Sequence, residues 1–260
     1  MQLISDLSQW RELRSKLKGS VGFVPTMGAL HEGHLSLLRK SVAENEHTVL
    51  SIFLNATQFN NSDDLTNYPS SVEEDLVLAR AVGVDVILLP DYAQVYPDDF
   101  RFQIHEEVFS KELCGSDRPG HFTGVLTVVF KLLNLVQPEK AYFGEKDYQQ
   151  YLLIKDMCAA LFLPTEIVGC ETLRETDGLA MSSRNRHLDP LARKLAGRFN
   201  QVLCQAQSDQ EATQTLEKLG CSVGYIKTQY GRRFGAVEIA TKNGSVRLID
   251  NLVPKGPQVI

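Results

Sequence analysis

The chain has 260 residues, which allows one large domain or a large domain with a smaller one. It is 43% hydrophobic, enough for an ordinary globular core, and its formal net charge is −5. That charge argues against a general attraction to nucleic acid or to an anionic membrane, so we expect neither as a partner. Five scattered cysteines without a Cys-x-x-Cys pair favour reduced thiols in a cytoplasmic protein. We expect no signal peptide and no membrane-spanning segment.

The first half of the sequence predicts a strand–helix–strand unit. Residues 4–18 have the apolar spacing of an amphipathic helix. Residues 21–24 are typical of a buried parallel strand, a helix is expected over residues 33–43, and residues 48–54 predict a second strand. The crossover should be right-handed. In such sheets functional side chains lie just past the strand carboxyl ends, where this chain has His31, His34, Asn55 and Gln58.

The turn after the first strand contains His31 and His34, three positions apart. Pro25 ends the strand, and Gly28 can adopt backbone angles that bring the turn close to a ligand. A helix start exposes unpaired N–H groups and a partial positive charge, which suits phosphate. A metal site or a polar surface is the alternative, although the His-Glu-x-x-His zinc pattern is not met. This stretch alone leaves these alternatives open.

The remaining segments extend the α/β pattern and then change character. Residues 60–70 are polar and turn-rich, a helix over 72–81 opens at Ser70 or Ser71, residues 84–89 predict a strand and residues 91–120 are loop-rich. A helix over 124–136, a strand over 141–143, a helix over 148–161 and a strand over 166–170 follow. After a polar loop over 174–186 come helices over 190–206 and 210–219 and strands over 223–226, 236–240 and 246–249. We predict two domains, residues 1–172 and 173–260.

Five motifs follow one another along the chain. They are PTMGALHEGH at residues 25–34, QF at 58–59, RPGHF at 118–122, FGEKDYQQ at 143–150 and DGLAMSSRN at 177–185. In this order they resemble the pantoate–β-alanine ligase family, and the closing RLIDN at 247–251 also looks like that family's end. The resemblance implies a Rossmann-like parallel-sheet nucleotidyltransferase domain followed by a smaller α+β lid domain.

That family is related to the class I aminoacyl-tRNA synthetases. Residues 31–34 stand where that superfamily has its "HIGH" signature, and residues 181–184 where it has its mobile "KMSKS" loop. The resemblance implies a reaction in two steps that belongs to the synthesis of a coenzyme A precursor. Pantoate and ATP form pantoyl adenylate and pyrophosphate, and β-alanine then attacks the acyl carbon, which gives pantothenate and AMP.

The resemblance also implies roles for individual residues. His34, His31 and Lys146 would be catalytic through contacts with phosphate oxygens on which charge develops. Without the resemblance, Lys146 would be a solvated surface lysine and Asp147 a helix N-cap. The complete ATP-binding set that we expect is Pro25, Met27, Gly28, His31, His34, Gly144, Lys146, Asp147, Leu173, Met181, Ser182, Ser183 and Arg184.

Pantoate and β-alanine would bind nearby, with ordinary polar surface or core as the alternative for each residue. The expected residues are Thr26, Met27, Gln58, Phe59, Arg118, Phe143 and Gln150. Glu74 and Asp75 resemble an acidic pair linked to Mg²⁺, although a helix-start role explains them almost as well. We therefore expect Mg²⁺ with ATP as substrate, no tightly bound organic cofactor, and ATP, pantoate and β-alanine as small-molecule partners. A homodimer is implied by the resemblance.

The loop over residues 174–186 is expected to close over the triphosphate. An acyl adenylate is destroyed by water, so the site must close during the first step. Ser182, Ser183 and Arg184 would gain charge-assisted hydrogen bonds only when triphosphate is present. The second domain is therefore expected to act as a lid, and a passive interdomain loop is the alternative.

Departures from the family and two other functions complete the prediction. The family usually has proline at the position of Ala56 and arginine at that of Ser70, so we expect altered loop stiffness and a lost surface contact; residues 224–233 also differ from the usual text. A nucleotidyltransferase acting on a phosphate ester or on another small acid is one alternative, but a phosphate acceptor would call for arginines instead of Gln58 and Gln150. A non-catalytic nucleotide-binding protein would be expected to lose one of the motif residues.

Overall fold

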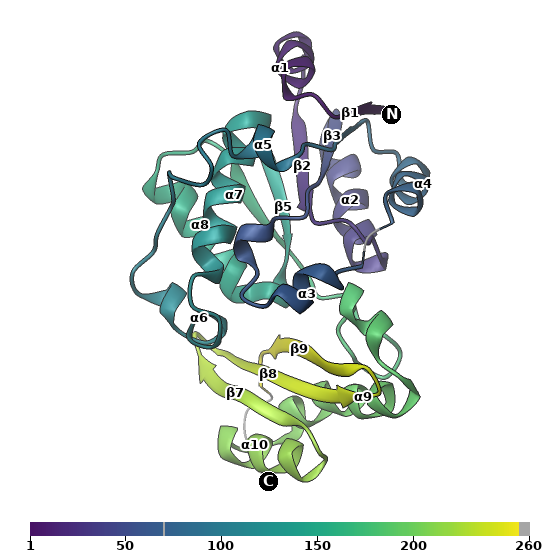
Figure 1. Cartoon of the computed structure of the whole chain (residues 1–260), viewed down its shortest axis with the longest axis vertical. Coiled ribbons are helices and arrows are strands. Elements are labelled where there is room, and N and C mark those ends of the chain that lie inside the picture. The colour runs from purple at the N-terminus through teal and green to yellow at the C-terminus, as the bar shows by residue number, and fades with distance from the viewer. Residues whose placement is uncertain (70, 255–260) are drawn as a thin grey trace. The chain divides into compact units, whose positions relative to one another are not determined.

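The computed structural model describes residues 1–69 and 71–254, which divide into two compact units (Figure 1). Unit 1 comprises residues 1–145 and 149–171, and unit 2 comprises residues 146–148 together with the described chain from residue 172. The α/β fold class predicted from the sequence is confirmed. The short segment 146–148 follows strand β5 of unit 1 in sequence, but its contacts place it in unit 2.

Unit 1 is built on a six-stranded parallel sheet in the order β1-β4-β3-β2-β5-β6. The strands are β1 (Gln2–Ile4), β2 (Val21–Thr26), β3 (His47–Ile52), β4 (Val86–Leu88), β5 (Lys140–Gly144) and β6 (Glu166–Cys170). The chain leaves β2 toward one edge and β5 toward the other, so the direction of winding reverses between these two neighbours. Open α/β sheets bind ligands at the strand carboxyl ends at such a point.

Helices cover both faces of this sheet. They are α1 (Leu7–Lys16), α2 (Glu32–Glu44), α4 (Val72–Val82), α7 (His121–Val136) and α8 (Tyr148–Ala160). Figure 1 shows α2 and α4 on one side of the sheet and α7 and α8 on the other. Leu35 and Leu38 of α2 pack with Val24 of β2 and Leu50 of β3 in one buried cluster. This packing fixes the angle at which α2 leaves the sheet.

Some unit 1 elements differ from the sequence prediction. The first predicted helix begins only at Leu7, because Asp6 caps it by accepting a hydrogen bond from the Ser8 N–H, and β1 precedes it. Segments predicted as loops contain the short helices α3 (Ser62–Thr66), α5 (Tyr92–Val95) and α6 (Cys114–Asp117) and the 3₁₀ turn η2 (Phe109–Lys111). The 3₁₀ turns η1 (Ala56–Gln58) and η3 (Glu145–Asp147) lie in segments for which no element was predicted. Ser71 is the N-cap of α4, whereas Ser70 lies outside the described residues.

Unit 2 is a three-stranded antiparallel sheet with two helices packed on it. It contains β7 (Ser222–Gln229), β8 (Arg232–Thr241), β9 (Gly244–Leu252), the 3₁₀ helix η4 (Ser183–His187), α9 (Pro190–Gln205) and α10 (Asp209–Lys218). Phe199 and Leu203 of α9 and Leu216 of α10 share a core with Val237 and Leu248 of the sheet. The three strands are longer than predicted, because pairing along the central strand β8 also orders polar residues.

Two further properties concern the whole described chain. Across residues 1–69 and 71–254, no helix combines the length and apolar character needed to cross a bilayer. All five cysteines are free thiols, and burial raises the pKa of Cys158 and of Cys170 to about 11.

Candidate active site

The turn between β2 and α2 places the two predicted histidines at the start of α2. His31 is the N-cap, and its Nδ1 accepts a hydrogen bond from the Gly33 N–H at 3.1 Å. The His31 and His34 ring centroids lie 4.1 Å apart, with the planes tilted by 37°. Two imidazoles are thus held side by side at a helix N-terminus, which is a favourable place for a phosphate group.

The carboxylate of Asp75, a residue of α4, holds the main chain of this turn. Asp75 is 2% exposed, and its two oxygens accept hydrogen bonds from the Ala29 N–H at 2.9 Å and the Leu30 N–H at 2.6 Å. Gly28 and Ala29 both have positive φ, 85° and 50°, a region that a residue with a side chain enters only at a cost. A Cβ at Gly28 would lie 2.9 Å from Asp75 Oδ2, so glycine fits there for space as well as for conformation.

The two hydrogen bonds that Asp75 accepts are also relevant to the prediction that Glu74 and Asp75 bind Mg²⁺. Glu74, the other half of the predicted acidic pair, is exposed, whereas Asp75 is buried with both oxygens accepting from the main chain. Residues 1–69 and 71–254 contain no cluster of three or more acidic, histidine or cysteine side chains placed to share a metal ion. The contacts of Asp75 fit a role in holding the turn, and the assignment of the pair to Mg²⁺ stays a prediction.

Gln58 and Met27, both predicted for pantoate, are brought together in unit 1. Gln58 Nε2 lies 3.2 Å from Met27 Sδ, and Gln58 Oε1 accepts from Asn55 Nδ2 at 3.0 Å. The buried Asn55 in turn accepts from the Tyr96 hydroxyl at 2.8 Å. Burial raises the pKa of Tyr96 to about 12, so this phenol stays protonated and donates. The orientation of the Gln58 amide is therefore fixed through a chain of side chains.

The main chain of Gln58 is held from α7 and from the residues before it. Its carbonyl oxygen lies 3.2 Å from Arg118 Nη2 and 2.8 Å from His121 Nδ1. A Cβ at Gly124 would lie 2.5 Å from the Thr57 carbonyl oxygen, so only glycine lets α7 approach η1 this closely. Sequence reasoning missed Tyr96, His121 and Gly124; the signal for Gly124 was a glycine inside an otherwise apolar helix.

The other residues predicted for pantoate and β-alanine lie in different surroundings. Thr26 Oγ1 donates to the Ser51 carbonyl oxygen at 2.8 Å, and the Phe59 ring meets the Tyr68 ring edge-on at 5.7 Å. Phe143 is buried in β5, whereas Gln150 is partly exposed on α8. The neighbouring Gln149 is the buried one, and its side chain hydrogen-bonds the main chain of residues 109, 112 and 114.

In unit 2, Lys146 and Asp147 form a partly exposed pair. Lys146 Nζ lies 3.7 Å from Asp147 Oδ2, and the Lys146 side chain is 20% exposed. The Lys146 carbonyl oxygen accepts from Asn251 Nδ2 at 2.9 Å. Gly144, which ends β5, belongs to unit 1, so adjacent residues of one predicted motif are divided between the two units.

The polar segment over residues 174–186 is more ordered than a loop. Arg174 pairs with Ala180 in an antiparallel bridge, and the Met181 N–H donates to the Leu173 carbonyl oxygen at 3.0 Å. Gly178 occupies the tip with a φ of 92°. Ser182 caps η4 by accepting from the Arg184 N–H at 3.3 Å, and Ser183 is buried. The segment is a tight hairpin that leads into a 3₁₀ turn.

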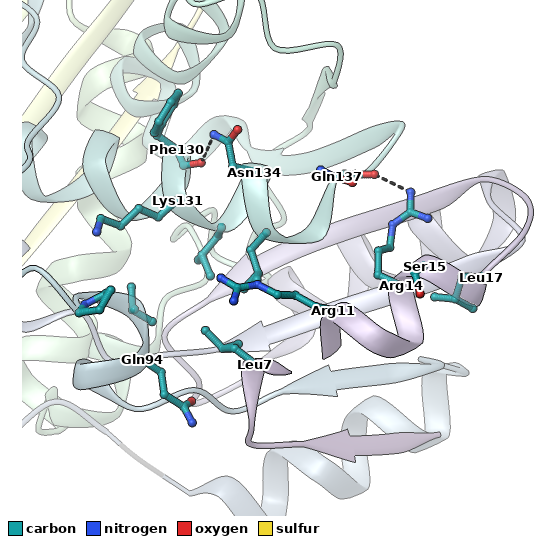
Figure 2. Close-up of a pocket in the computed structure, with 14 residues that line it drawn as sticks. Leu7, Arg11, Arg14, Ser15, Leu17, Gln94, Phe130, Lys131, Asn134 and Gln137 are labelled. Carbon is teal, nitrogen blue, oxygen red and sulfur yellow. Dashed lines mark hydrogen bonds between the residues drawn. The ribbon is translucent and has the colours of Figure 1, made fainter. Parts of the chain in front are cut away.

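A cavity of about 750 Å³ lies elsewhere in unit 1 (Figure 2). It is lined by residues of α1 and α7 and by Gln94, Val95 and Pro97, and none of the predicted site residues lines it. Two of its cations already have partners, since Arg14 donates to the carbonyl oxygens of Val136 and Gln137 and Lys131 pairs with Asp98. This cavity therefore does not include the histidine turn or the other residues predicted to bind substrates.

Comparison with known proteins matches these features to one family. The family model "Pantoate-beta-alanine ligase" matches residues 1–253. A pantothenate synthetase of Legionella pneumophila is 49% identical over 96% of this chain and 99% of its own length, and one of Bdellovibrio bacteriovorus is 46% identical over 96% and 98%. Among solved structures, a Francisella tularensis pantoate–β-alanine ligase complexed with βγ-ATP and β-alanine has a TM-score of 0.92 at 39% identity over 97% of each chain. A Thermus thermophilus pantothenate synthetase has a TM-score of 0.85 at 38% identity over 97% and 99%. The chain therefore belongs to the pantoate–β-alanine ligase family.

Proposed function

We propose that this chain joins pantoate to β-alanine through a pantoyl adenylate, with the β2–α2 turn as the phosphate-binding element. The observation that carries the proposal is the pair of imidazoles held 4.1 Å apart at the N-terminus of α2, beside the reversal point of the sheet. A ligase that uses ATP needs such preorganised donors where phosphate charge develops.

In the first step, a pantoate carboxylate oxygen attacks the α-phosphorus of ATP. A bond forms between that oxygen and phosphorus, and the bond to the β-phosphate bridging oxygen breaks, so pyrophosphate leaves with the electron pair. His34 and His31 donate hydrogen bonds to the phosphate oxygens, and Lys146 neutralises charge on the triphosphate. Gly28 lets the turn lie close to the nucleotide, and Gly144, Asp147, Leu173 and the segment 181–184 complete the ATP site.

In the second step, the amine of β-alanine attacks the acyl carbon. AMP leaves with the electron pair of the acyl–oxygen bond, and the amine loses a proton. The amide of Gln58, oriented through Asn55 and Tyr96, supports a role in holding the carboxylate and hydroxyls of pantoate. We assign Gln150 and Arg118 to the binding of pantoate and β-alanine. The packing of Met27 beside Gln58 supports an apolar wall for the methyl groups of pantoate.

Mg²⁺ enters this proposal as the partner of the ATP phosphates, and no step is routed through Glu74 and Asp75. A homodimer is part of the proposal, and it rests on the resemblance to the family. A cytoplasmic location is supported by five free thiols. Molar mass in solution by light scattering tests the dimer.

Isotope exchange between pyrophosphate and ATP tests the adenylate. With pantoate present and β-alanine absent, labelled pyrophosphate should enter ATP, and no exchange should occur when pantoate is omitted or replaced by a phosphate ester. When the pantoate carboxylate carries ¹⁸O, one labelled oxygen should appear in AMP after β-alanine is added. Product formation without exchange and without ¹⁸O transfer would contradict the adenylate route.

A further inference from the structure

The closing motif of residues 247–251 has no role in the chemistry proposed above, yet two of its polar side chains are buried. Asp250 is 3% exposed and Asn251 is 2% exposed. A buried charge or amide is costly unless partners satisfy it, so the partners of these two side chains indicate what they do.

Asn251 holds the main chain of Lys146. Its Nδ2 donates to the Lys146 carbonyl oxygen at 2.9 Å, and its Oδ1 accepts from Arg232 Nε at 2.7 Å. The guanidinium of the same Arg232 lies over the Tyr148 ring, 4.2 Å from its centroid. Asn251 of β9 therefore contacts the segment 146–148 at Lys146, and Arg232 of β8 contacts it at Tyr148, on the other side of Asp147.

Asp250 holds the hairpin that leads to Ser182. Arg174 Nη1 lies 2.7 Å from Asp250 Oδ2, and Arg174 Nη2 lies 3.0 Å from Asp250 Oδ1, a bidentate pair. Arg174 Nη1 also donates to the Gly178 carbonyl oxygen at the hairpin tip at 3.0 Å. Asn200 of α9 donates to Asp250 Oδ2 at 3.0 Å, and the Asn251 N–H donates to Asp250 Oδ1 at 2.7 Å.

We propose that Asp250 and Asn251 are positioning residues that set two parts of the triphosphate site from one strand. Consecutive side chains of a strand point to opposite faces, so one residue serves the hairpin before Ser182 and the next serves Lys146. A shift of β9 by one residue would turn each of these side chains to the opposite face of the sheet, which couples the register of this strand to both segments. The inference rests on the proposed role of Lys146 in phosphate binding.

A double-mutant cycle on Asn251→Ala and Lys146→Ala tests the inference. Pantoate-dependent pyrophosphate release is measured for each single variant and for the double variant, with kcat and the KM for ATP determined separately. Asn251→Ala alone should lower kcat/KM for ATP by roughly ten- to a hundred-fold, because a misplaced catalytic group loses much of its effect. In the Lys146→Ala background it should cost less than about twofold, because the two residues act as a unit. Pantoate affinity, measured by calorimetry without ATP, should not change.

Asp209→Asn is the matched control. Asp209 pairs with the buried Arg233 in the same unit, 2.9 Å from Oδ1 to Nε, and its carboxylate also accepts from the main chain and hydroxyl of Thr228 on β7. It should lower the melting temperature and leave the rate in the folded enzyme unchanged. If Asn251→Ala does not fold, Arg232→Lys replaces it, since that change removes the Nε contact with Asn251 while keeping the charge.

Four results are decisive. Equal losses from Asn251→Ala with and without Lys146 would show a general structural effect and overturn the inference, as would an unchanged rate for both Asn251→Ala and Arg232→Lys. An unchanged rate for Lys146→Ala itself would overturn the proposed role of that lysine, which is a separate failure. A loss that disappears in the Lys146→Ala background supports the inference.

Discussion

The histidine turn of unit 1 and the Lys146 segment of unit 2 are held in complementary ways. In the turn, the carboxylate of Asp75 accepts two main-chain hydrogen bonds, from Ala29 and Leu30. At Lys146, the amide of Asn251 donates to a main-chain carbonyl oxygen. The first contact is charge-assisted and spans 45 positions of sequence, whereas the second is neutral and spans 105. A charge-assisted contact therefore holds the turn with the proposed donors His31 and His34, and a neutral contact holds the segment with the proposed cation Lys146.

The largest expected effect comes from removing what the histidine turn presents. His34→Ala should lower the rate of pantoate-dependent pyrophosphate release by roughly 10²–10³, the usual cost of one lost preorganised donor. Thermal melting should stay close to that of the parent chain. His47→Ala is the control. His47 begins β3, and its ring contacts the Lys18 carbonyl oxygen. A His34→Ala enzyme with nearly full activity would show that the turn does not carry the first step.

Replacing Asp75 should lower the activity less than His34→Ala does, but it should lower the stability of the fold more. Asp75→Asn leaves one accepting oxygen and puts an amide NH₂ against a main-chain N–H, so we expect a loss of about 1–3 kcal/mol in the free energy of unfolding. The rate should fall because the positive-φ turn relaxes. Glu74→Gln, at the exposed neighbouring position, should change neither quantity.

The Mg²⁺ dependence separates two readings of Asp75. If the carboxylate only holds the turn, the Mg²⁺ concentration for half-maximal rate should be the same in Asp75→Asn and the parent chain. A raised Mg²⁺ requirement with unchanged melting would instead assign Asp75 to the ion and contradict its role in holding the turn.

The pantoate side of unit 1 is tested at Gln58. Gln58→Leu should raise the KM for pantoate more than the KM for ATP, because a substrate oxygen left unpaired costs about 1–3 kcal/mol. Gln150→Leu should act in the same direction. Gln103→Leu is a control, since the Gln103 side chain is exposed and donates to the Phe100 carbonyl oxygen. A larger effect on ATP than on pantoate would mean that the two substrates have been assigned to the wrong residues.

The hairpin of unit 2 is tested by hydrogen exchange. With ATP and pantoate bound, amide exchange over residues 174–186 should slow, and Arg184→Ala should weaken that protection because a charge-assisted contact is lost. Arg247→Ala, on β9 and outside this segment, is the control. Equal exchange with and without ligands, together with full activity of Arg184→Ala, would mean that the segment does not close over the triphosphate.

The smallest expected effect is on acid stability near the same hairpin. The hydrogen bond from Arg193 lowers the pKa of Asp177, whose carboxylate also accepts from the Leu179 N–H. A carboxyl whose folded pKa is lowered stabilises the fold above its unfolded pKa, about 3.9, and loses that contribution as pH falls below it. Asp177→Asn should therefore reduce the loss of unit 2 structure between pH 4 and the lowered pKa, followed by near-ultraviolet circular dichroism. An unchanged acid transition would exclude this pair as a contributor.

The sequence predicted the histidine turn better than the Lys146 segment for a physical reason. Strand, proline, glycine and N-cap lie within a dozen residues, and local signals of this kind specify a turn directly. The contacts of Asp75 and Asn251 are different, because both residues act on main chain far away in sequence, and no periodicity indicates which main-chain groups they meet. The resemblance predicted Asp75 as half of a magnesium pair, with a helix-start role as the alternative, whereas its burial and its two N–H partners show that it contacts the histidine turn.

Some of the candidate site could be predicted only through the motifs. Gln58 lies beside Met27 because η1, a 3₁₀ turn without a sequence signal, places it there. Gly124 contributes because it lets α7 pack close to η1. Gln150 was predicted from the resemblance alone, and its role in pantoate binding stays a prediction. The neighbouring Gln149 amide hydrogen-bonds the main chain of residues 109, 112 and 114.

The assignment of residues 146–148 to unit 2 has a consequence for how the chain can be divided. A fragment that starts at residue 172 lacks the carbonyl group that Asn251 contacts and the aromatic ring that Arg232 covers. Such a fragment would expose these two side chains, and a single cut at residue 172 does not release a complete unit. During synthesis, residues 146–148 leave the ribosome first and remain without these partners until β8 and β9 form. Strands β8 and β9 thus complete a structure that the middle of the chain begins, so Lys146 reaches its final conformation only after β9 has formed.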